Sequence, residues 1–475
     1  MNPRLRFGLG IALLVVVLLA VGAVGFLGGH QLRKLADAPA ASGGSTTPGQ
    51  SSSPSASAPA VVGQATVPPP GPTSRAAGPT PDPAKVGAEL QPLLRAAALG
   101  PKVGGYVADA STGTVLFDQT GSTGYIPAST TKLATASAIL TVAKSTSRFT
   151  TFAVQGSVPG QVVLIGGGDP TLSAAPSGHA SLYPNAARLA QLAAMIRKSF
   201  GSKVTSIVVD GSRYSGALEA PGWAAEDVPS DYQSSITALV VDGGLPATGG
   251  IIRSQNPDLE AGRALADLLG LPHTVPVRRG VAPADAKRLG SVQSAPMLDL
   301  VEQMLKDSDN VIAEMLGRQV AVAEHQPASF AGTVIAVRAV LAKLGVSSGV
   351  DLVDASGLSV EDRIAPSALA ALLRVIVGGK HPALGGVVSA MPVAGWDGTL
   401  ATRYQVKGSR AGAGEVRAKT GSLTGTNTLA GIVRDASGRL LVFAFMADKV
   451  GVYDELPADV ALDAAAAALA GCGCR

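Results

Sequence analysis

Three short motifs, far apart but in a fixed order, constrain the fold of this 475-residue chain more than any other feature. They are Ser129-Thr130-Thr131-Lys132, Ser308-Asp309-Asn310 and Lys419-Thr420-Gly421. Each motif alone is weak evidence, because Ser, Lys, Thr and Gly are common residues. Together they supply a hydroxyl with a nearby amine, a polar turn and a second amine. A fold that uses all three must bring distant segments to one place.

The first motif opens a segment, STTKLATASAIL, that is typical of a helix start. Residues three apart share a helix face, so the Lys132 amine can reach the Ser129 hydroxyl. A hydroxyl becomes a nucleophile when a base takes its proton, and Lys serves as that base when burial or a nearby positive charge lowers its pKa. Lys419 is the expected source of that charge. The alternative interpretation of Ser129 is an ordinary helix N-cap.

The second motif follows an amphipathic stretch, 297–306, and precedes an apolar segment. Its simpler interpretation is a polar turn between two helices. In a catalytic site, the Ser308 hydroxyl would pass a proton between Lys132 and the leaving amine. Asn310 would hold both Lys132 and a substrate carbonyl. We assign no chemical role to Asp309.

The third motif lies in EVRAKTGSLTGTNTLAGIV, whose alternation predicts a strand leading into a hairpin. An exposed strand surface is the alternative interpretation. In a site, Lys419 and Thr420 would bind a terminal carboxylate through charge-assisted contacts. Gly421, without a side chain, would let the substrate backbone approach. The backbone N–H groups of Ser129 and Ser422 would form an oxyanion hole.

Composition excludes several other classes of protein. The net charge is +4 with 15% charged and 4% aromatic residues, and no Lys/Arg-rich run occurs, which argues against a nucleic-acid partner. The histidines are isolated and none has the spacing of metal ligands, so neither a metal site nor a cofactor is expected. A Ser-His-Asp triad stays open, although Lys132 already supplies a base. The histidines are His30, His179, His273, His325 and His381.

The N-terminus carries an uncharged, almost wholly apolar run at 7–27 that is long enough to span a bilayer. Two arginines in residues 1–6 favour a cytoplasmic tail, although basic residues at 33–34 weaken the asymmetry. A cleaved signal peptide is the alternative. The run is long for a signal core, and the nearest small-x-small site, Ala36-Asp37-Ala38, lies well beyond it. We therefore expect an uncleaved signal anchor, with the body on the extracytoplasmic side of the cell membrane.

Composition then divides the rest of the chain. Residues 38–83 are rich in Pro, Ser, Gly and Ala and predict a disordered linker. Residues 84–147 and 291–470 are predicted to form the catalytic domain. Residues 148–290 separate the first two motifs widely and predict one or more inserted, β-rich accessory domains.

Local patterns predict individual elements within these parts. In the catalytic part, two hairpins and a final Ala-rich helix with Gly471 as a stop signal are expected. In the insertion, two strands and a helix are expected. The hairpins pair 103–110 with 114–119 and 429–434 with 440–447. The final helix is 457–470, and the helix in the insertion is 186–200. The strands in the insertion are 162–165 and 204–209.

The tail, 471–475, holds both cysteines of the chain, Cys472 and Cys474. A bond between them would close a very small, easily reduced ring. We expect a frayed tail with two thiols, and an intermolecular disulfide is the alternative.

Beyond the motifs, three segments resemble one family. They are Gly166–Leu172 (GGGDPTL), Ser356–Ser359 (SGLS) and Gly395–Leu400 (GWDGTL). With the motif triple shared by class A β-lactamases and penicillin-binding proteins, the chain resembles the class C low-molecular-mass penicillin-binding proteins. These are D-alanyl-D-alanine carboxypeptidases/endopeptidases with a large insertion, and the resemblance runs from about residue 84 to 470.

The chain departs from that family at three places. Val360 stands where Arg commonly follows SGLS, a change that would affect the preferred stem peptide. Asp242-Gly243-Gly244 replaces Asp-Gly-Asn, and Asp448 replaces Asn.

The resemblance implies an α+β fold. It comprises a transpeptidase/β-lactamase-like domain, with an antiparallel sheet from both chain ends flanked by helices and a helical part bearing the first two motifs. It also implies that Ser129 attacks peptidoglycan stem peptides and is acylated by β-lactams. A secreted β-lactamase and a non-enzymatic β-lactam sensor are the alternatives. The wide gap between the first two motifs favours the insertion-bearing peptidases.

Overall fold

The computed structural model describes residues 78–200, 203–246 and 250–474. The predicted tail at 1–6, the predicted anchor at 7–27 and the linker up to residue 77 lie outside these residues. Within the described ranges, no helix is long and apolar enough to cross a membrane. The first helix of the described residues, α2 (Pro83–Leu94), starts within one residue of the predicted start of the body, where Asp82 Oδ1 accepts the Ala84 N–H at 2.8 Å.

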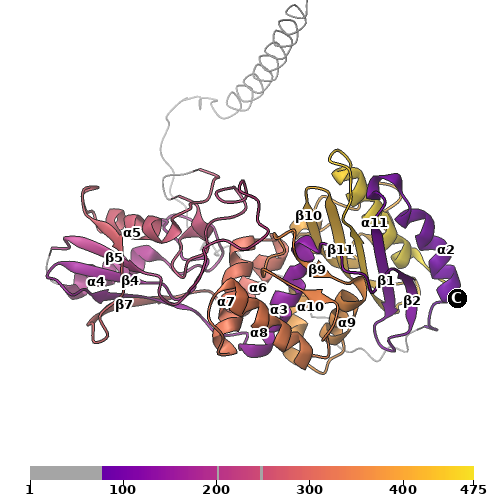
Figure 1. The fold of residues 1–475 in the computed structure, drawn as a ribbon, viewed down its shortest axis with the longest axis horizontal. Helices are drawn as coiled ribbons and strands as arrows, with labels where there is room; N and C mark the ends of the chain where they lie inside the picture. Colours follow the sequence, from indigo (N-terminus) through magenta and orange to yellow (C-terminus); the bar gives the residue numbers. More distant parts are fainter. Residues whose placement is uncertain (1–77, 201–202, 247–249, 475) are drawn as a thin grey trace, which may run out of the picture. The chain divides into compact units, whose positions relative to one another are not determined.

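A five-stranded antiparallel sheet joins the two ends of the described chain (Figure 1). Its strand order is β10-β11-β12-β1-β2, and β1 pairs with β12 from Val103↔Ala447 to Asp109↔Leu441. Both predicted hairpins are confirmed, although the strand expected at 429–434 begins three residues earlier. The strands are β1 (Val103–Asp109), β2 (Val115–Gln119), β10 (Val416–Leu423), β11 (Thr426–Arg434) and β12 (Leu440–Ala447).

Helices cover both faces of this sheet, so β11 and β12 are buried along almost their whole length rather than at alternate residues. On one face lie α2, the short 3₁₀ turn η1 (Ala97–Leu99) and α11 (Glu455–Gly471), which pack around Phe443 and Phe445. On the other lies α9 (Pro366–Val377), which contacts β1 and β12. The predicted C-terminal helix is confirmed, with Gly471 as its last residue rather than the residue after it.

A helical layer next to the sheet is built around α3 (Lys132–Val142), whose first nine residues are all buried. A helix that is buried on every side needs neighbours all round it, and α6, α7 and α8 provide them. The helix predicted at 297–306 is confirmed as α6. The helices are α6 (Met297–Lys306), α7 (Asn310–Ala323), α8 (Phe330–Lys343) and α10 (Gly385–Ala390).

A second five-stranded sheet, in the order β6-β5-β4-β3-β7, is built from residues between 150 and 293. It is mixed: β3 pairs antiparallel with β4 and β7, whereas β4-β5 and β5-β6 are parallel. Helices α4 (Leu189–Phe200) and α5 (Pro257–Leu268) join its apolar core. The strands are β3 (Thr150–Gln155), β4 (Gln161–Ile165), β5 (Ser206–Asp210), β6 (Val277–Arg279) and β7 (Arg288–Gln293).

The two strands expected within this region are confirmed as β4 and β5. The helix expected at 186–200 starts only at Leu189. Residues before it pair with another segment instead: Ser173 N–H donates to Ala187 O at 2.7 Å, and Leu189 N–H donates to Ser173 O at 2.9 Å. A bridge to a distant residue therefore takes the place of the first helical turn.

The remaining elements are short. They are η2 (Ala128–Thr131), η3 (Asp242–Gly244), β8 (Val350–Asp351), β9 (Arg363–Ile364), η4 (Pro382–Leu384), η5 (Gly398–Leu400) and η6 (Arg410–Gly412). The predicted α+β class is confirmed.

The expectation of a frayed, reduced tail is wrong. Cys472 and Cys474 form a disulfide, and Cys472 is buried against the apolar core beneath α11. Asp82 N–H donates to Cys474 O at 2.6 Å, and Ala436 N–H donates to Cys472 O at 3.3 Å. The tail is ordered because these backbone contacts tie it to α2 and to the β11–β12 turn.

Candidate active site

Ser129 and Lys132 meet at the junction of η2 and α3. The Lys132 ammonium donates to Ser129 Oγ at 2.8 Å, to Asn310 Oδ1 at 2.6 Å and to the Ser356 carbonyl at 2.8 Å. In a 3₁₀ turn, side chains three residues apart eclipse one another, which places the hydroxyl beside the amine. The N-cap interpretation of Ser129 is wrong, since α3 begins at Lys132 after a Thr131 that makes no side-chain cap.

The Lys132 amine is fully buried, whereas Ser129 remains partly exposed. Burial lowers the pKa of Lys132 to about 8, against the opposing charges of Asp354, Asp309 and Glu314. Of the two expected causes, burial is the one that lowers the pKa of Lys132, whereas the charge interaction between the two amines lowers the pKa of Lys419. The site thus holds an accessible hydroxyl beside an amine that can give up its proton near neutral pH.

The second motif lies between α6 and α7, as the turn interpretation predicts, and it also faces the first motif. Ser308 has a positive φ of 59°. Its Oγ accepts from Lys419 Nζ at 2.9 Å, while Asn310, the first residue of α7, contacts Lys132. The two motifs meet because the turn sends Ser308 toward β10 and Asn310 toward α3.

Asp309 points away from both amines and anchors this turn. It caps α7 by accepting the Ile312 N–H at 2.9 Å, and its other oxygen accepts from Tyr183 OH at 2.8 Å and from Arg253 Nη2 at 3.0 Å. Burial opposes ionisation of this carboxyl, but Arg253 and the hydrogen bonds hold its pKa below its usual value. Tyr183 and Arg253 come from the region between the first two motifs, and no local pattern in the sequence pointed to them.

Lys419 is buried within β10, so the exposed-strand interpretation is wrong. Its ammonium donates to Ser308 Oγ and, at 2.8 Å, to the Thr420 carbonyl. Burial lowers the pKa of Lys419 well below its usual value, and the nearby charge of Lys132 lowers it further. Thr420 Oγ1 donates to Thr399 Oγ1 at 2.9 Å, which brings the GWDGTL segment to the same edge of the site.

Gly421 is also needed where the chain packs against itself. A Cβ there would meet Thr428 Oγ1 first and would lie 2.8 Å from Pro127 O and 2.9 Å from Ser129 N, both in the η2 segment. The approach of a substrate backbone at this residue stays a prediction. Thr428 Oγ1 reinforces the approach by donating to Pro127 O at 2.8 Å. Glycine therefore lets β10 lie against the segment that carries Ser129, and Ser422 follows on the exposed side of that contact.

The SGLS segment contributes contacts that the three motifs did not predict. The Ser356 carbonyl is the third acceptor around Lys132. Gly357 has φ of 81°, and a Cβ there would collide with Ala128 O. The only sequence signal for this role was the family resemblance of the segment, because a backbone carbonyl leaves no trace in residue type.

The positions that depart from the family lie around this site rather than in its hydrogen bonds. Val360 is half exposed. Asp448 accepts from Lys102 Nζ at 2.7 Å and from the Ile126 N–H at 3.2 Å. Gly244 has a φ of 90°, and its carbonyl accepts the Ser254 N–H at 2.7 Å. Across residues 78–474, apart from the two short gaps, no cluster of three or more His, Cys, Asp and Glu side chains is arranged to hold a metal ion.

The sequence matches one protein family and is similar to several known proteins. The family model described as the D-Ala-D-Ala carboxypeptidase 3 (S13) family matches residues 86–249 and 245–469. A carboxypeptidase DacB of Mycolicibacterium smegmatis is 43% identical over 394 residues, covering 81% of this chain and 84% of that protein. A carboxypeptidase of Mycobacterium tuberculosis is 41% identical over 426 residues, covering 86% and 91%.

Among solved structures, penicillin binding protein 4 (dacB) from Haemophilus influenzae matches with a TM-score of 0.68 at 23% identity, covering 81% of this chain and 98% of that one. The same protein in complex with a β-lactam matches with a TM-score of 0.59. At these identities the structural likeness establishes the fold, and the expected transpeptidase-like architecture is confirmed.

Proposed function

The chain belongs to the D-Ala-D-Ala carboxypeptidase 3 (S13) family, and from that premise we propose that it is a serine-type hydrolase of peptidoglycan stem peptides. Ser129 Oγ attacks the carbonyl of the penultimate D-Ala. The C–N bond to the terminal D-Ala breaks, and the leaving amine takes a proton. Water then hydrolyses the acyl-enzyme and regenerates Ser129.

The observation that carries the proposal is the 2.8 Å contact between the fully buried Lys132 amine and the partly exposed Ser129 hydroxyl. With a pKa of about 8, roughly a tenth of Lys132 is neutral at pH 7. A general base works best when its pKa lies near the working pH. Lys132 therefore takes the Ser129 proton as the Oγ–C bond forms.

Ser308 is the proposed proton relay to the leaving amine. Because Lys419 donates to Ser308 Oγ, the Ser308 proton is directed elsewhere and can pass to a nitrogen in the site. Asn310 holds Lys132 through Oδ1, and its Nδ2, which lies 3.4 Å from Tyr232 O, is the donor proposed for the substrate carbonyl.

Lys419 and Thr420 are the proposed carboxylate site. A buried ammonium whose pKa is depressed gains most from an arriving anion, since the anion restores the charge that burial opposes. The Thr420 hydroxyl adds a directed hydrogen bond. The oxyanion donors are the N–H groups of Ser129 and Ser422, which lie on the two segments that Gly421 allows to approach.

The test is covalent labelling of the full chain with a fluorescent penicillin, read by intact mass. One adduct is expected on the parent and none on Ser129→Ala, with Thr130→Ser as a neighbouring control that keeps its label. No adduct on the parent, or an adduct that survives Ser129→Ala, would refute the assignment.

Substrate assays then separate related activities. Release of D-Ala from a pentapeptide indicates carboxypeptidase activity, and cleavage of a crosslinked muropeptide indicates endopeptidase activity. Fast turnover of penicillin would instead indicate a β-lactamase, and a stable adduct without peptide cleavage would indicate a β-lactam sensor.

For location, we propose that residues 7–27 anchor the chain in the cell membrane with the body outside the cytoplasm. The support is the length of this apolar run and the arginines before it. Fractionation of cells that express the full chain tests this: the protein should stay with membranes after a high-salt wash, and removal of residues 1–27 should abolish its export.

A further inference from the structure

Behind Lys132, α7 carries a buried charge pair that the proposed acyl transfer does not use. Glu314 and Arg318 are 0% and 1% exposed, and their closest charged atoms, Oε2 and Nη1, are 3.6 Å apart. Two charges buried at that separation do not recover what they lose in leaving water, and apolar residues of similar volume are often at least as stable. The pair is therefore expected to serve something other than stability.

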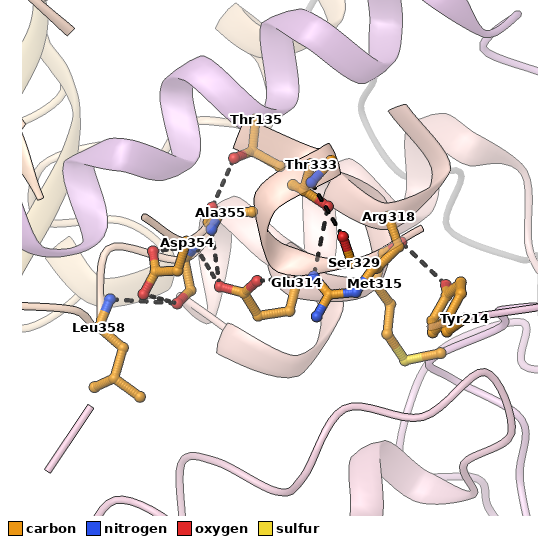
Figure 2. Close-up of polar contacts among 12 residues, drawn as sticks. Thr135, Tyr214, Glu314, Met315, Arg318, Ser329, Thr333, Asp354, Ala355 and Leu358 are labelled. Atoms are coloured by element: carbon orange, nitrogen blue, oxygen red, sulfur yellow. Dashed lines mark hydrogen bonds and ion pairs between the residues drawn. The ribbon is translucent and has the colours of Figure 1, made fainter. Parts of the chain in front are cut away.

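Glu314 Oε1 holds the backbone that leads to Lys132. It accepts the Ala355 N–H at 2.9 Å and the Ser356 N–H at 2.8 Å, as Figure 2 shows for Ala355. The carbonyls of the same two residues are held from the opposite side by α3: Thr135 Oγ1 donates to Ala355 O at 2.6 Å, and Lys132 donates to Ser356 O. The peptide unit that joins Ala355 to Ser356 is thus held between Glu314 on α7 and Thr135 on α3. The next unit carries the Ser356 carbonyl and the Gly357 N–H, and it lies between Lys132 and Asp354 Oδ1, which also accepts the Ser356 N–H at 3.1 Å.

Arg318 in turn keeps the Glu314 charge in place. Its guanidinium carbon lies 3.8 Å from the centroid of the Phe330 ring, and Figure 2 shows the side chain on the far side of Glu314 from the 354–358 loop. Asp354 stabilises the 354–358 loop from within, because it accepts the Gly357 N–H at 2.6 Å. Neither Arg318 nor Glu314 touches Ser129.

The position of the Ser356 carbonyl decides where the Lys132 lone pair points. A neutral amine has two N–H groups and one lone pair. Ser356 O and Asn310 Oδ1 can only accept hydrogen bonds, so both N–H groups go to them. The lone pair is then left facing the third neighbour, Ser129 Oγ, which is the hydroxyl it must deprotonate.

We propose that Glu314 is a positioning residue for the base: it holds the two peptide units that precede the Ser356 carbonyl, Asp354 holds the Gly357 N–H of the carbonyl's own unit, and the carbonyl placed in this way turns the Lys132 lone pair toward Ser129. The inference rests on the proposed function, because it concerns the step in which Ser129 is acylated. Without this hold, the carbonyl can move and an N–H of the amine can face the hydroxyl instead.

The charge of Glu314 also affects the protonation of Lys132, which provides a second way to test this role. It favours the protonated form of Lys132, as do Asp354 and Asp309, while burial opposes that form. Burial and the charge of Asp354 raise the pKa of Glu314 itself to about 7, so it is mostly ionised where Lys132 titrates. The other charged groups facing this cluster are Arg318, Asp362 and Lys419. Neutralising Glu314 should therefore let Lys132 lose its proton at lower pH.

The experiment measures the acylation rate constant of the full chain with a fluorescent penicillin across the acidic limb of its pH profile. Glu314→Gln keeps an oxygen for the two N–H groups but removes the charge. The acylation rate constant of this variant at its high-pH plateau should stay within about threefold of that of the parent. The midpoint of the rise in rate with pH should shift to lower pH by about half a pH unit or more. Asp258→Asn is the matched control, because it neutralises an arginine-paired carboxylate in the second sheet.

The double variant Glu314→Leu/Arg318→Met removes the hold without leaving a single buried charge. It should fold, as followed by thermal melting, yet acylate about tenfold more slowly or worse, as expected for a misplaced base. A folded double variant that acylates within threefold of the parent overturns the proposal. If the double variant does not fold, Glu314→Gln decides, and a limb that matches both the parent and Asp258→Asn overturns it. A parent chain without any adduct would instead overturn the proposed function.

Discussion

Replacing Gly421 with Ala should separate the third motif from the nucleophile and slow acylation. In the native chain, β10 rests on the η2 backbone at this residue. The added Cβ would meet the Thr428 hydroxyl, which must turn away, and would lie 2.8 Å from Pro127 O and 2.9 Å from Ser129 N. The last two are backbone atoms that cannot rotate away, so one of the two segments must shift.

The size of the shift follows from these distances. Ordinary contacts of a Cβ begin at 3.4 Å, so the segments must part by roughly 0.6 Å. That movement spreads the N–H groups of Ser129 and Ser422, the proposed oxyanion donors. Because a misplacement of about 1 Å can cost about 100-fold in rate, we expect a decrease of about tenfold. Overpacking should also cost about 1–3 kcal/mol in unfolding free energy.

The assay is the rate of labelling by a fluorescent penicillin, together with a thermal melt. Penicillin concentration is varied so that the maximal acylation rate is separated from the apparent affinity, and the rate should change more than the affinity. Gly87→Ala in α2 is the matched control, since a Cβ there meets nothing within 4 Å. The control should label at the parent rate and melt slightly higher, because Ala favours a helix over Gly. A Gly421→Ala variant with the parent's rate and melting temperature would show that this close approach does not constrain the site.

Three further predictions concern the groups behind the motifs. Acylation by penicillin should rise with pH through an apparent pKa of about 8, because Lys132 must lose its proton to act as the base; a rate that is flat across this range in stopped-flow measurements would contradict that role. Asp309→Ala should destabilise the chain by about 3–5 kcal/mol in urea unfolding, because it leaves Arg253 buried without its partner, whereas Asp309→Asn should cost less since it keeps the helix cap. Trp223→Phe removes the donor that lies 2.8 Å from Asp354 Oδ2 and should cost about 1–3 kcal/mol by the same measurement; an unchanged unfolding midpoint would show that water replaces it.

Much of the local structure could be predicted from the sequence. Alternating or continuous apolar runs predicted both hairpins of the first sheet, an amphipathic pattern predicted α6, and an Ala-rich composition predicted α11. These patterns report which face of a segment is buried, which is a local property. The helix at 186–200 was predicted too long because its first turn is replaced by a bridge to Ser173, a contact that no local pattern encodes.

The contacts of the candidate site were likewise predictable only in part. The spacing of Ser129 and Lys132 was enough to predict their contact, since three residues along a helical turn bring side chains together. No local pattern predicted the residues that hold the site from outside the motifs, which are Glu314, Arg253 and Ser356. Their roles depend on buried charges and backbone carbonyls, which act only once distant segments meet.

The sequence by itself therefore determined the family, the α+β class and the three segments that must converge. Only the tertiary structure decided why Lys132 loses its proton readily and why Gly421 is a glycine. Burial is the larger cause of the lowered pKa of Lys132, and Gly421 accommodates the close approach of the chain's own backbone. Burial and close backbone approach are properties of the packed molecule, because both are set by atoms that lie far apart along the chain.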